Sequence, residues 1–177
     1  MNADEIASAL RSNYVTGTIF SGVYAADSVP ITFAVLPASC VVNTDPTDEP
    51  GQHWIALFQR QAGVLEYFDS YGKDPAYHQL HLLPLITENR LVKQDYQLQS
   101  DLTTVCGQYA MFFIYNRCTG KSYSDILKLF SRDVYANGKM VQRFVNRTFQ
   151  LKTPLVDVDC WYNSSLILCF HDKFIGQ

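Results

Sequence analysis

One segment of the sequence is apolar on nearly every side of the helix that it would form. Residues 108–115 read Gln-Tyr-Ala-Met-Phe-Phe-Ile-Tyr and carry no charge. A helix that is apolar all round is buried, so other elements must cover it on every side. The chain has 177 residues, 47% of them hydrophobic, which is long enough to bury one substantial core. We therefore expect a single domain over residues 1–177, with this segment at its centre.

The patterns around this segment predict a sheet with further helices packed around it. Apolar residues at helical spacing predict amphipathic helices over residues 3–13, 75–83, 122–133 and 139–149. Runs rich in β-branched and aromatic residues predict strands over residues 33–42, 53–59, 64–70 and 92–98. Residues 156–170 fit a strand or a helix equally well. The sum is an α+β fold with a short, mostly antiparallel central sheet flanked by helices.

The charge balance and the hydropathy exclude several classes of protein. The net charge is −3 and the sequence pI is about 5.7, whereas nucleic-acid binding depends on basic residues that neutralise phosphate. A local basic patch at Lys139, Arg143 and Arg147 is the exception, although a solvated helix face is the simpler interpretation. No segment approaches the ~18 consecutive apolar residues of a membrane span, and residues 1–14 lack a signal-peptide pattern. We expect no membrane partner and a reducing compartment.

The cysteines and histidines give no metal or disulfide pattern. The five cysteines are odd in number and none has C-x-x-C spacing; they are Cys40, Cys106, Cys118, Cys160 and Cys169. A disulfide framework and a zinc knuckle both need paired cysteines. His78 and His81 lie three residues apart, but no cysteine pair accompanies them. We therefore expect neither a metal nor another cofactor.

A histidine and an aspartate are expected to meet at the open end of one hairpin. Residues 53–59 and 64–70 have the alternating pattern of paired strands. In an antiparallel hairpin, the numbers of two directly opposed residues always add up to the same sum. If Gln59 faces Gly63, this pairing sum is 122 and His53 lies directly opposite Asp69. A loop one residue longer moves its partner to Ser70, unless a bulge restores the register. In either register the imidazole and the carboxylate lie within reach of each other.

Cys106 has the surroundings that a nucleophilic cysteine requires. It stands where a polar run ends and the apolar segment begins, which places it at a helix N-terminus. Backbone N–H groups and the helix dipole favour a thiolate at this position. Gly107 leaves the approach to the sulfur open. With His53 to exchange protons and Asp69 to orient it, Cys106 completes the logic of a catalytic triad.

An acyl-transfer enzyme also needs donors for the developing oxyanion. The backbone N–H of Cys106 is one candidate, and the side-chain amide of Gln99, seven residues upstream, is another. Gln97 is a close competitor that the sequence barely separates from Gln99. The residues then follow in the order histidine, acid, glutamine and cysteine, each on the type of element that its role needs.

These residues also carry a resemblance to a known family. The segments QHWIALF, LEYFDSYG and QSDLTTVCGQYAMFF resemble the motif blocks of the adenovirus maturation protease family, the adenains. More broadly they are similar to the clan that includes the SUMO-specific proteases. The seven-residue interval between Gln99 and Cys106 is closer to the adenains. The resemblance extends over residues 1–120 and implies His53 as general base, Asp69 as its orienter, Cys106 as nucleophile and Gln99 in the oxyanion hole.

The resemblance implies a viral cysteine endopeptidase that cleaves capsid or virion precursor proteins at Gly-rich sites during maturation. Trp54 adjoins His53, where it would narrow the cleft for small residues, or it would pack beneath the sheet. Adenain is basic and is activated by DNA and by a disulfide-linked peptide. This chain is acidic and has no cysteine just upstream of Gln99, so we expect no DNA activation and no peptide cofactor.

A protease of a virophage or of a polinton-like or adinto-like virus fits this pattern better than adenain itself. The expected protein is a monomer that acts inside the infected host cell, in the virus factory or nucleus, and is packaged in the virion. The alternative function is a deconjugase that removes a ubiquitin-like modifier with the same triad. Acetyl transfer is a third possibility, and a degenerate interaction module is disfavoured because all four site positions are intact.

Overall fold

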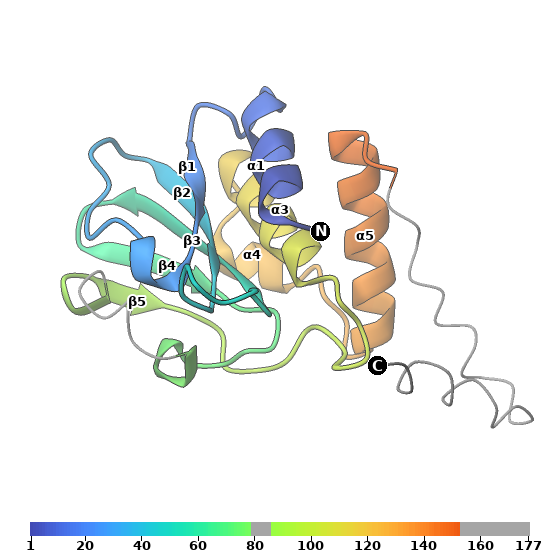
Figure 1. Ribbon diagram of the computed structural model, residues 1–177. Coiled ribbons are helices and arrows are strands. Elements are labelled where there is room, and N and C mark those ends of the chain that lie inside the picture. Colours follow the sequence, from blue (N-terminus) through green and yellow to red (C-terminus); the bar gives the residue numbers. More distant parts are fainter. Residues whose placement is uncertain (79–85, 153–177) are drawn as a thin grey trace, which may run out of the picture.

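The sheet of this α+β protein has five strands in the order β1-β2-β3-β4-β5 (Figure 1). The computed structural model describes residues 1–78 and 86–152. The three central strands pair antiparallel, and each edge strand adds a parallel pair. The predicted fold class is confirmed. The strands are β1 (Phe20–Tyr24), β2 (Ala38–Asn43), β3 (Trp54–Gln61), β4 (Val64–Phe68) and β5 (Arg90–Val92).

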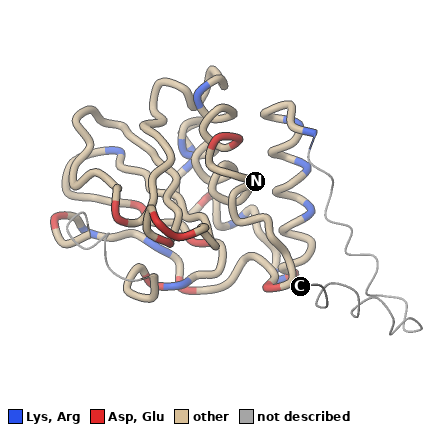
Figure 2. Tube along the Cα trace, in the orientation of Figure 1, with Lys and Arg blue, Asp and Glu red and all other residues tan. Residues whose placement is uncertain are grey.

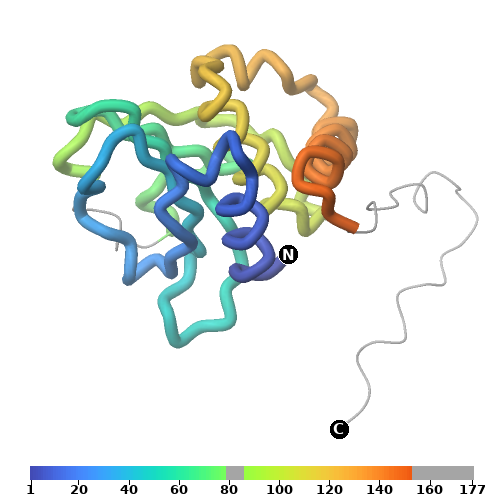
Figure 3. The backbone as a smooth tube through the Cα atoms, turned by 90° about the horizontal axis from the view of Figure 1, so that it is seen from above, coloured from blue at the N-terminus to red at the C-terminus, as the bar shows by residue number. Residues whose placement is uncertain are grey.

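The principal helices pack on one face of this sheet. In the views of Figures 1 and 3, α3 lies between the sheet and α5, with α1 beside it. The contacts between elements support this arrangement, since α3 touches β3, α1, α4 and α5. The helices are α1 (Ala3–Ser12), α3 (Cys106–Cys118), α4 (Tyr123–Leu127) and α5 (Val134–Phe149), and two short 3₁₀ turns are η1 (Ala26–Ser28) and η2 (Pro75–His78).

Helix α3 is the buried helix that the apolar segment predicts. All of its residues but Tyr115 and Cys118 are buried. The ring of Phe113 stacks on that of Phe68 in β4, with centroids 4.6 Å apart. Near the C-terminal end of the helix, Arg117 forms a two-pronged ion pair with Glu66 of β4, at 2.5 and 2.8 Å. Both contacts fix the C-terminal half of α3 against the sheet, and the first residue of the helix is Cys106.

The observed register of the β3–β4 hairpin corrects the expected one. Leu57 pairs with Tyr67 and Ala56 with Phe68, a pairing sum of 124 rather than 122. The register shifts between Phe58 and Gln61, where β3 carries one residue more than β4, as in a β-bulge. Both sums are even, so odd-numbered residues of the two strands still share one face.

Several predicted boundaries differ from the observed ones. The helix expected over 122–133 is only α4, which ends at Leu127. The helix expected over 139–149 begins earlier, at Val134, because the Asp133 side chain accepts from two backbone N–H groups there. The strand expected over 33–42 begins at Ala38. The strand expected over 92–98 is wrong, because β5 ends at Val92, runs parallel to β4, and is followed by irregular backbone over residues 93–98.

The remaining differences concern segments near the undescribed parts of the chain. The helix expected over 75–83 is the single turn η2 as far as His78; residues 79–83 lie outside the described residues. Residues 156–170, expected as strand or helix, also lie outside them. Within residues 1–78 and 86–152, no helix is long and apolar enough to cross a membrane.

Candidate active site

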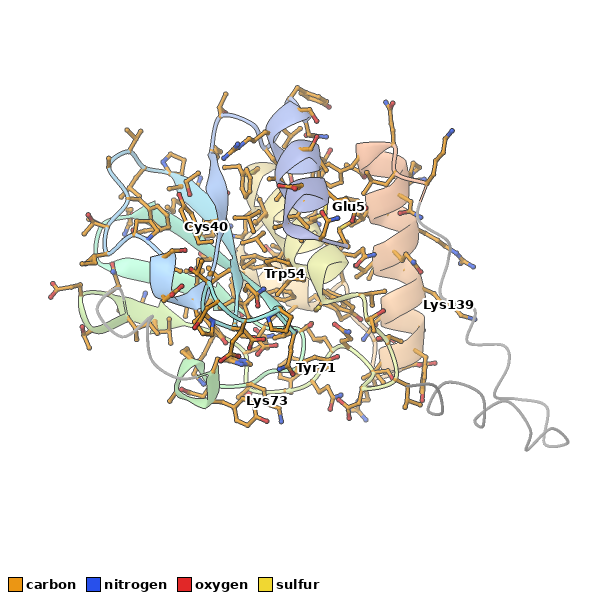
Figure 4. All side chains as sticks on the ribbon, in the orientation of Figure 1. Glu5, Cys40, Trp54, Tyr71, Lys73 and Lys139 are labelled. Carbon is orange, nitrogen blue, oxygen red and sulfur yellow. The ribbon has the colours of Figure 1, made fainter. Side chains whose placement is uncertain are left out.

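Three chain segments meet at one end of the sheet. His53 directly precedes β3, Asp69 directly follows β4, and Cys106 opens α3. Trp54 and Tyr71, which flank this end of the sheet, are labelled in Figure 4. All three candidate side chains are buried, with 8%, 1% and 8% exposure. Because two strand ends and one helix start hold them, their positions depend on regular elements rather than on long loops.

His53 and Asp69 form a buried hydrogen-bonded pair. The Nε2 atom of His53 lies 2.8 Å from Oδ1 of Asp69. The same oxygen accepts the backbone N–H of Tyr71 at 2.8 Å. Burial on its own would raise the pKa of Asp69, but its hydrogen bonds hold that pKa well below the usual range. Asp69 is therefore ionised at neutral pH and fixes the ring of His53.

The thiol of Cys106 is electrostatically coupled to the other side of this ring. Burial alone would raise the pKa of Cys106, but hydrogen bonding to His53 and the charge of His53 outweigh burial. Backbone N–H groups of Trp54 and Gly107 lower the pKa further. The net result is a pKa below the usual value of a cysteine. Among the described cysteines, Cys118 differs, since burial raises its pKa to about 11.

His53 gains the proton that Cys106 loses. Burial opposes the charged imidazolium, but the hydrogen bonds and charges of Asp69 and Cys106 raise the pKa of His53 to about 9. The Nδ1 atom of His53 is buried and makes no hydrogen bond of ordinary geometry. The thiol of Cys106 therefore influences the pKa of His53 without a tight hydrogen bond between them. Catalytic hydrogen bonds are often loose before substrate binds. The arrangement favours the thiolate–imidazolium pair over the neutral thiol and imidazole.

Trp54 packs against the first turn of α3. Its side chain is partly buried, on the face of the sheet that α3 covers. A Cβ atom built on Gly107 would lie 3.3 Å from Cδ1 of Trp54 and 3.1 Å from Cδ1 of Ile6, which is tight. Glycine at position 107 thus lets both side chains approach α3 closely without a shift of either. The packing of Trp54 against the sheet and α3 matches the second alternative, and a role in narrowing the cleft stays a prediction.

The two candidate glutamines have different surroundings. Gln99 is fully buried, and its Nε2 donates to the Tyr71 hydroxyl at 3.1 Å and to the Thr103 carbonyl at 2.8 Å. Gln97 is exposed and its Nε2 donates to Asp101 and to a backbone carbonyl. Gln99 is linked to the surroundings of His53 through Tyr71, whose ring centroid lies 4.9 Å from that of His53.

His78 is a site residue that the sequence analysis missed. Its Nε2 atom lies 2.7 Å from Oδ2 of Asp69, the oxygen that His53 does not use. Its spacing from His81 suggested only a metal site. The available signal was its position nine residues after Asp69, beyond Gly72, since a tight turn there brings the chain back.

His53, Asp69 and His78 are also a group whose ligand atoms, within 4.8 Å of one another, could hold a metal ion. Each imidazole Nε2 already lies at hydrogen-bond distance from its own carboxylate oxygen. The described contacts of these three residues are those of a hydrogen-bonded cluster.

A cavity of about 640 Å³ opens beside the cluster. His53, Tyr71 and His78 form part of its wall, so a bound molecule can approach the imidazole from this side. The acidic residues Asp45, Glu49 and Asp101 and the basic Lys73 also line it. Its polar wall fits a peptide segment better than an apolar ligand.

Comparison with known proteins finds viral cysteine proteases. The chain is 29% identical over 100 residues to a cysteine protease of African swine fever virus, covering 50% of this chain and 36% of the relative. It is 27% identical over 110 residues to the SUMO-1 cysteine protease of another isolate, covering 54% and 40%. The chain thus spans only 36–40% of the length of these relatives. No model of a known protein family matches it.

Solved structures share the fold. The crystal structure of the African swine fever virus protease has a TM-score of 0.55 at 18% identity, over 86% of this chain and 67% of that one. The central domain of an uncharacterized protein from Legionella pneumophila has a TM-score of 0.52 at 13% identity, over 85% and 97%. The names of the viral relatives agree with the expected clan of cysteine proteases that includes the SUMO-specific enzymes.

The coupling between Cys106 and His53 can be measured by titrating the histidine. Replacing Cys106 by alanine removes two of the interactions that raise the pKa of His53, so its titration midpoint should fall from about 9. The measurement is a pH series of nitrogen–proton NMR spectra of the imidazole. Cys118→Ala, at the far end of α3, is the control and should leave the midpoint in place. An unchanged midpoint in Cys106→Ala would contradict the coupling.

Proposed function

We propose that this chain is a cysteine endopeptidase with Cys106 as nucleophile, His53 as proton carrier and Asp69 as its orienter. The observation that carries this proposal is a low-pKa thiol at a helix start, coupled to a buried imidazole that a carboxylate holds. Each role matches the residue type and the position that nucleophilic catalysis requires. The named viral relatives, which are cysteine proteases, support the same activity.

The chemistry follows from the ion pair. The Cys106 thiolate attacks the carbonyl carbon of the scissile peptide and forms a tetrahedral intermediate. His53, protonated below about pH 9, gives its proton to the departing amine, and a thioester remains. A water molecule then attacks the thioester while His53 accepts the proton of that water. The acid is released, and the thiolate and imidazolium are restored.

The oxyanion of each intermediate needs preorganised donors. The backbone N–H of Cys106 at the start of α3 is the first, and we assign Gln99 as the second. Both hydrogen bonds of the Gln99 Nε2 atom now go to Tyr71 and Thr103. One of them must be released when the oxyanion forms. Burial of Gln99 favours a strong interaction, because water does not compete there.

The proposed substrates are capsid or virion precursor proteins with glycine beside the scissile bond. The contact between Trp54 and Gly107 brings a bulky ring next to the nucleophile, which favours small residues in the cleft. The proposal includes an origin in a virophage or a polinton-like or adinto-like virus, action in the infected cell and packaging in the virion. The viral source of the relatives supports this setting.

A second candidate is a deconjugase of a ubiquitin-like modifier. The observation that favours it is the name of one relative, SUMO-1 cysteine protease. Both functions use the same triad but differ in what is recognised. A deconjugase binds a folded modifier, whereas a maturation protease needs only the residues around the scissile bond. Comparing a Gly-Gly peptide with a folded modifier fused to the same peptide separates them.

The catalytic assignment predicts graded losses of peptide cleavage. Cys106→Ala should abolish turnover of a Gly-Gly peptide while circular dichroism shows an intact fold. Gln99→Ala removes one oxyanion donor and should lower kcat by about 10²–10³-fold, whereas Gln97→Ala, the matched control, should stay near the unmodified enzyme. Retained turnover in Cys106→Ala rejects the proposal. A silent Gln99→Ala with an inactive Gln97→Ala assigns the oxyanion hole to the other amide.

One face of α5 carries basic residues, which are the feature of this chain that would favour binding to DNA. Lys139, Arg143 and Arg147 line a hollow of about 530 Å³ together with Met140 and Phe144. Figure 2 shows this basic stripe along α5 in blue. Acidic residues outnumber basic ones in the chain, 17 to 14, so long-range attraction to polyphosphate is weak.

We therefore predict peptide cleavage without DNA. The rate should change little when duplex DNA is added at two salt concentrations. A large stimulation that disappears as salt rises, and that is lost in Arg143→Glu, would show that the α5 stripe outweighs the overall charge. That result would overturn the prediction of DNA-independent activity without affecting the catalytic assignment.

A further inference from the structure

Asp69 is held by two histidines, one on each carboxylate oxygen. His53 Nε2 lies 2.8 Å from Oδ1, and His78 Nε2 lies 2.7 Å from Oδ2. The proposed mechanism uses only the first contact. We propose that His78 is a positioning residue, whose Nε2–H fixes the Asp69 carboxylate so that Oδ1 faces His53. This inference rests on the proposed function, because it assigns a role in orienting the same triad.

The chain between Asp69 and His78 is held in a shape that brings the second histidine back. The N–H of Gly72 donates to the Asp69 carbonyl at 2.9 Å. Gly72 has a φ of +68°, and a Cβ there would lie 2.5 Å from the carbonyl oxygen of Tyr96. Only glycine permits this close approach. The turn therefore reverses the chain directly after Asp69.

The 3₁₀ turn η2 is then fixed in place. The Asp74 side chain accepts the N–H of Ala76 at 2.9 Å, and its carbonyl accepts that of Tyr77 at 2.8 Å. Lys93, just after β5, pairs with Asp74 at 3.1 Å. The last residue of η2 is His78. Its position beside Asp69 is thus set by the contacts of Gly72 and Asp74 as well as by its own hydrogen bond.

Without His78, Oδ2 of Asp69 would lose its short hydrogen bond, and the buried hydroxyl of Tyr67, which also interacts with this carboxylate, would be the nearby donor left. The side chain of Asp69 is only 1% exposed and that of His78 only 10%, so water has little access to the contact. A buried charged group that loses a hydrogen bond pays a large desolvation cost. The carboxylate would then turn toward other donors or toward the cavity. Either movement takes Oδ1 away from His53 and loosens the imidazole beside Cys106.

The surroundings of His78 connect it to both His53 and the cavity. The two imidazole rings lie 5.5 Å apart at 31°, and the ring of Tyr77 meets that of His78 edge-on. His78 also lines the cavity that His53 lines. The other ionisable groups of that cavity are Asp45, Glu49, His53, Tyr71, Lys73, Tyr77 and Asp101. None of these groups donates a hydrogen bond to Oδ2 of Asp69 in place of His78; outside the cavity wall, the buried Tyr67 hydroxyl also interacts with this carboxylate.

Three substitutions of His78 separate its hydrogen bond from its ring. His78→Phe keeps a ring and removes the donor. His78→Gln places an amide nitrogen near the position of Nε2, while His78→Asn, the matched control, carries the same amide too far back to reach. Thermal unfolding and circular dichroism check the fold, and if His78→Phe fails to fold, His78→Asn still tests the proposal.

Two readouts report the effect. With a Gly-Gly peptide, His78→Phe and His78→Asn should lose about tenfold in kcat with little change in KM, and His78→Gln should recover most of it. The pH midpoint of Cys106 alkylation by iodoacetamide, followed by mass spectrometry, should rise in the Phe and Asn variants and stay in place in the Gln variant. Alkylation needs no substrate, so it tests His78 even if the peptidase assignment fails.

Wild-type kcat and alkylation midpoint in a folded His78→Phe or His78→Asn would overturn the inference. So would a His78→Gln variant as impaired as His78→Phe, because ring packing rather than hydrogen bonding would then explain the loss.

Discussion

The site depends on a single buried carboxylate. Asp69 is 1% exposed, and an ionised group in that position is stable only when hydrogen-bond donors surround it. Its donors come from three segments: His53 before β3, His78 at the end of η2 and the backbone of Tyr71 in the turn. Satisfying this one charge therefore brings the hairpin end, the turn and η2 together. The same arrangement orients the imidazole toward the start of α3, so a structural requirement and a catalytic one share the same hydrogen bonds.

The nucleophile owes its position to the burial of α3. The helix is covered by the sheet, by α1 and by α5 (Figure 3), and it is anchored by the Arg117–Glu66 ion pair near its end. Close packing leaves little freedom at its first residue. The thiol of Cys106 therefore stays beside His53 and the backbone donors that lower its pKa. A surface helix, free to slide or tilt, would not keep the sulfur at this point.

The sequence predicted the fold class, the buried helix and the group His53, Asp69 and Cys106, because alternation, helical periodicity and a helix start are local signals. It did not predict the register, since the bulge in β3 depends on pairing with both neighbouring strands. The wrong register did not change the predicted site, because the pairing sum differs by two and His53 and Asp69 therefore stay on the same face of the sheet. His78 was missed because its approach depends on the turn at Gly72 packing against Tyr96, a contact between distant segments. The partners of Gln99 likewise come from loops whose meeting no local pattern encodes.

The central claim is that the Cys106 thiolate, next to His53, is the group that attacks a peptide carbonyl. It is tested most directly with a Gly-Gly peptide whose C-terminus carries an electrophile that traps thiolates, followed by intact-mass measurement and peptide mapping of all cysteines. The account predicts one adduct per chain, on Cys106, and none on Cys40 or Cys118, since burial raises the pKa of both. An adduct on another cysteine, or a folded protein that forms no adduct, would contradict it.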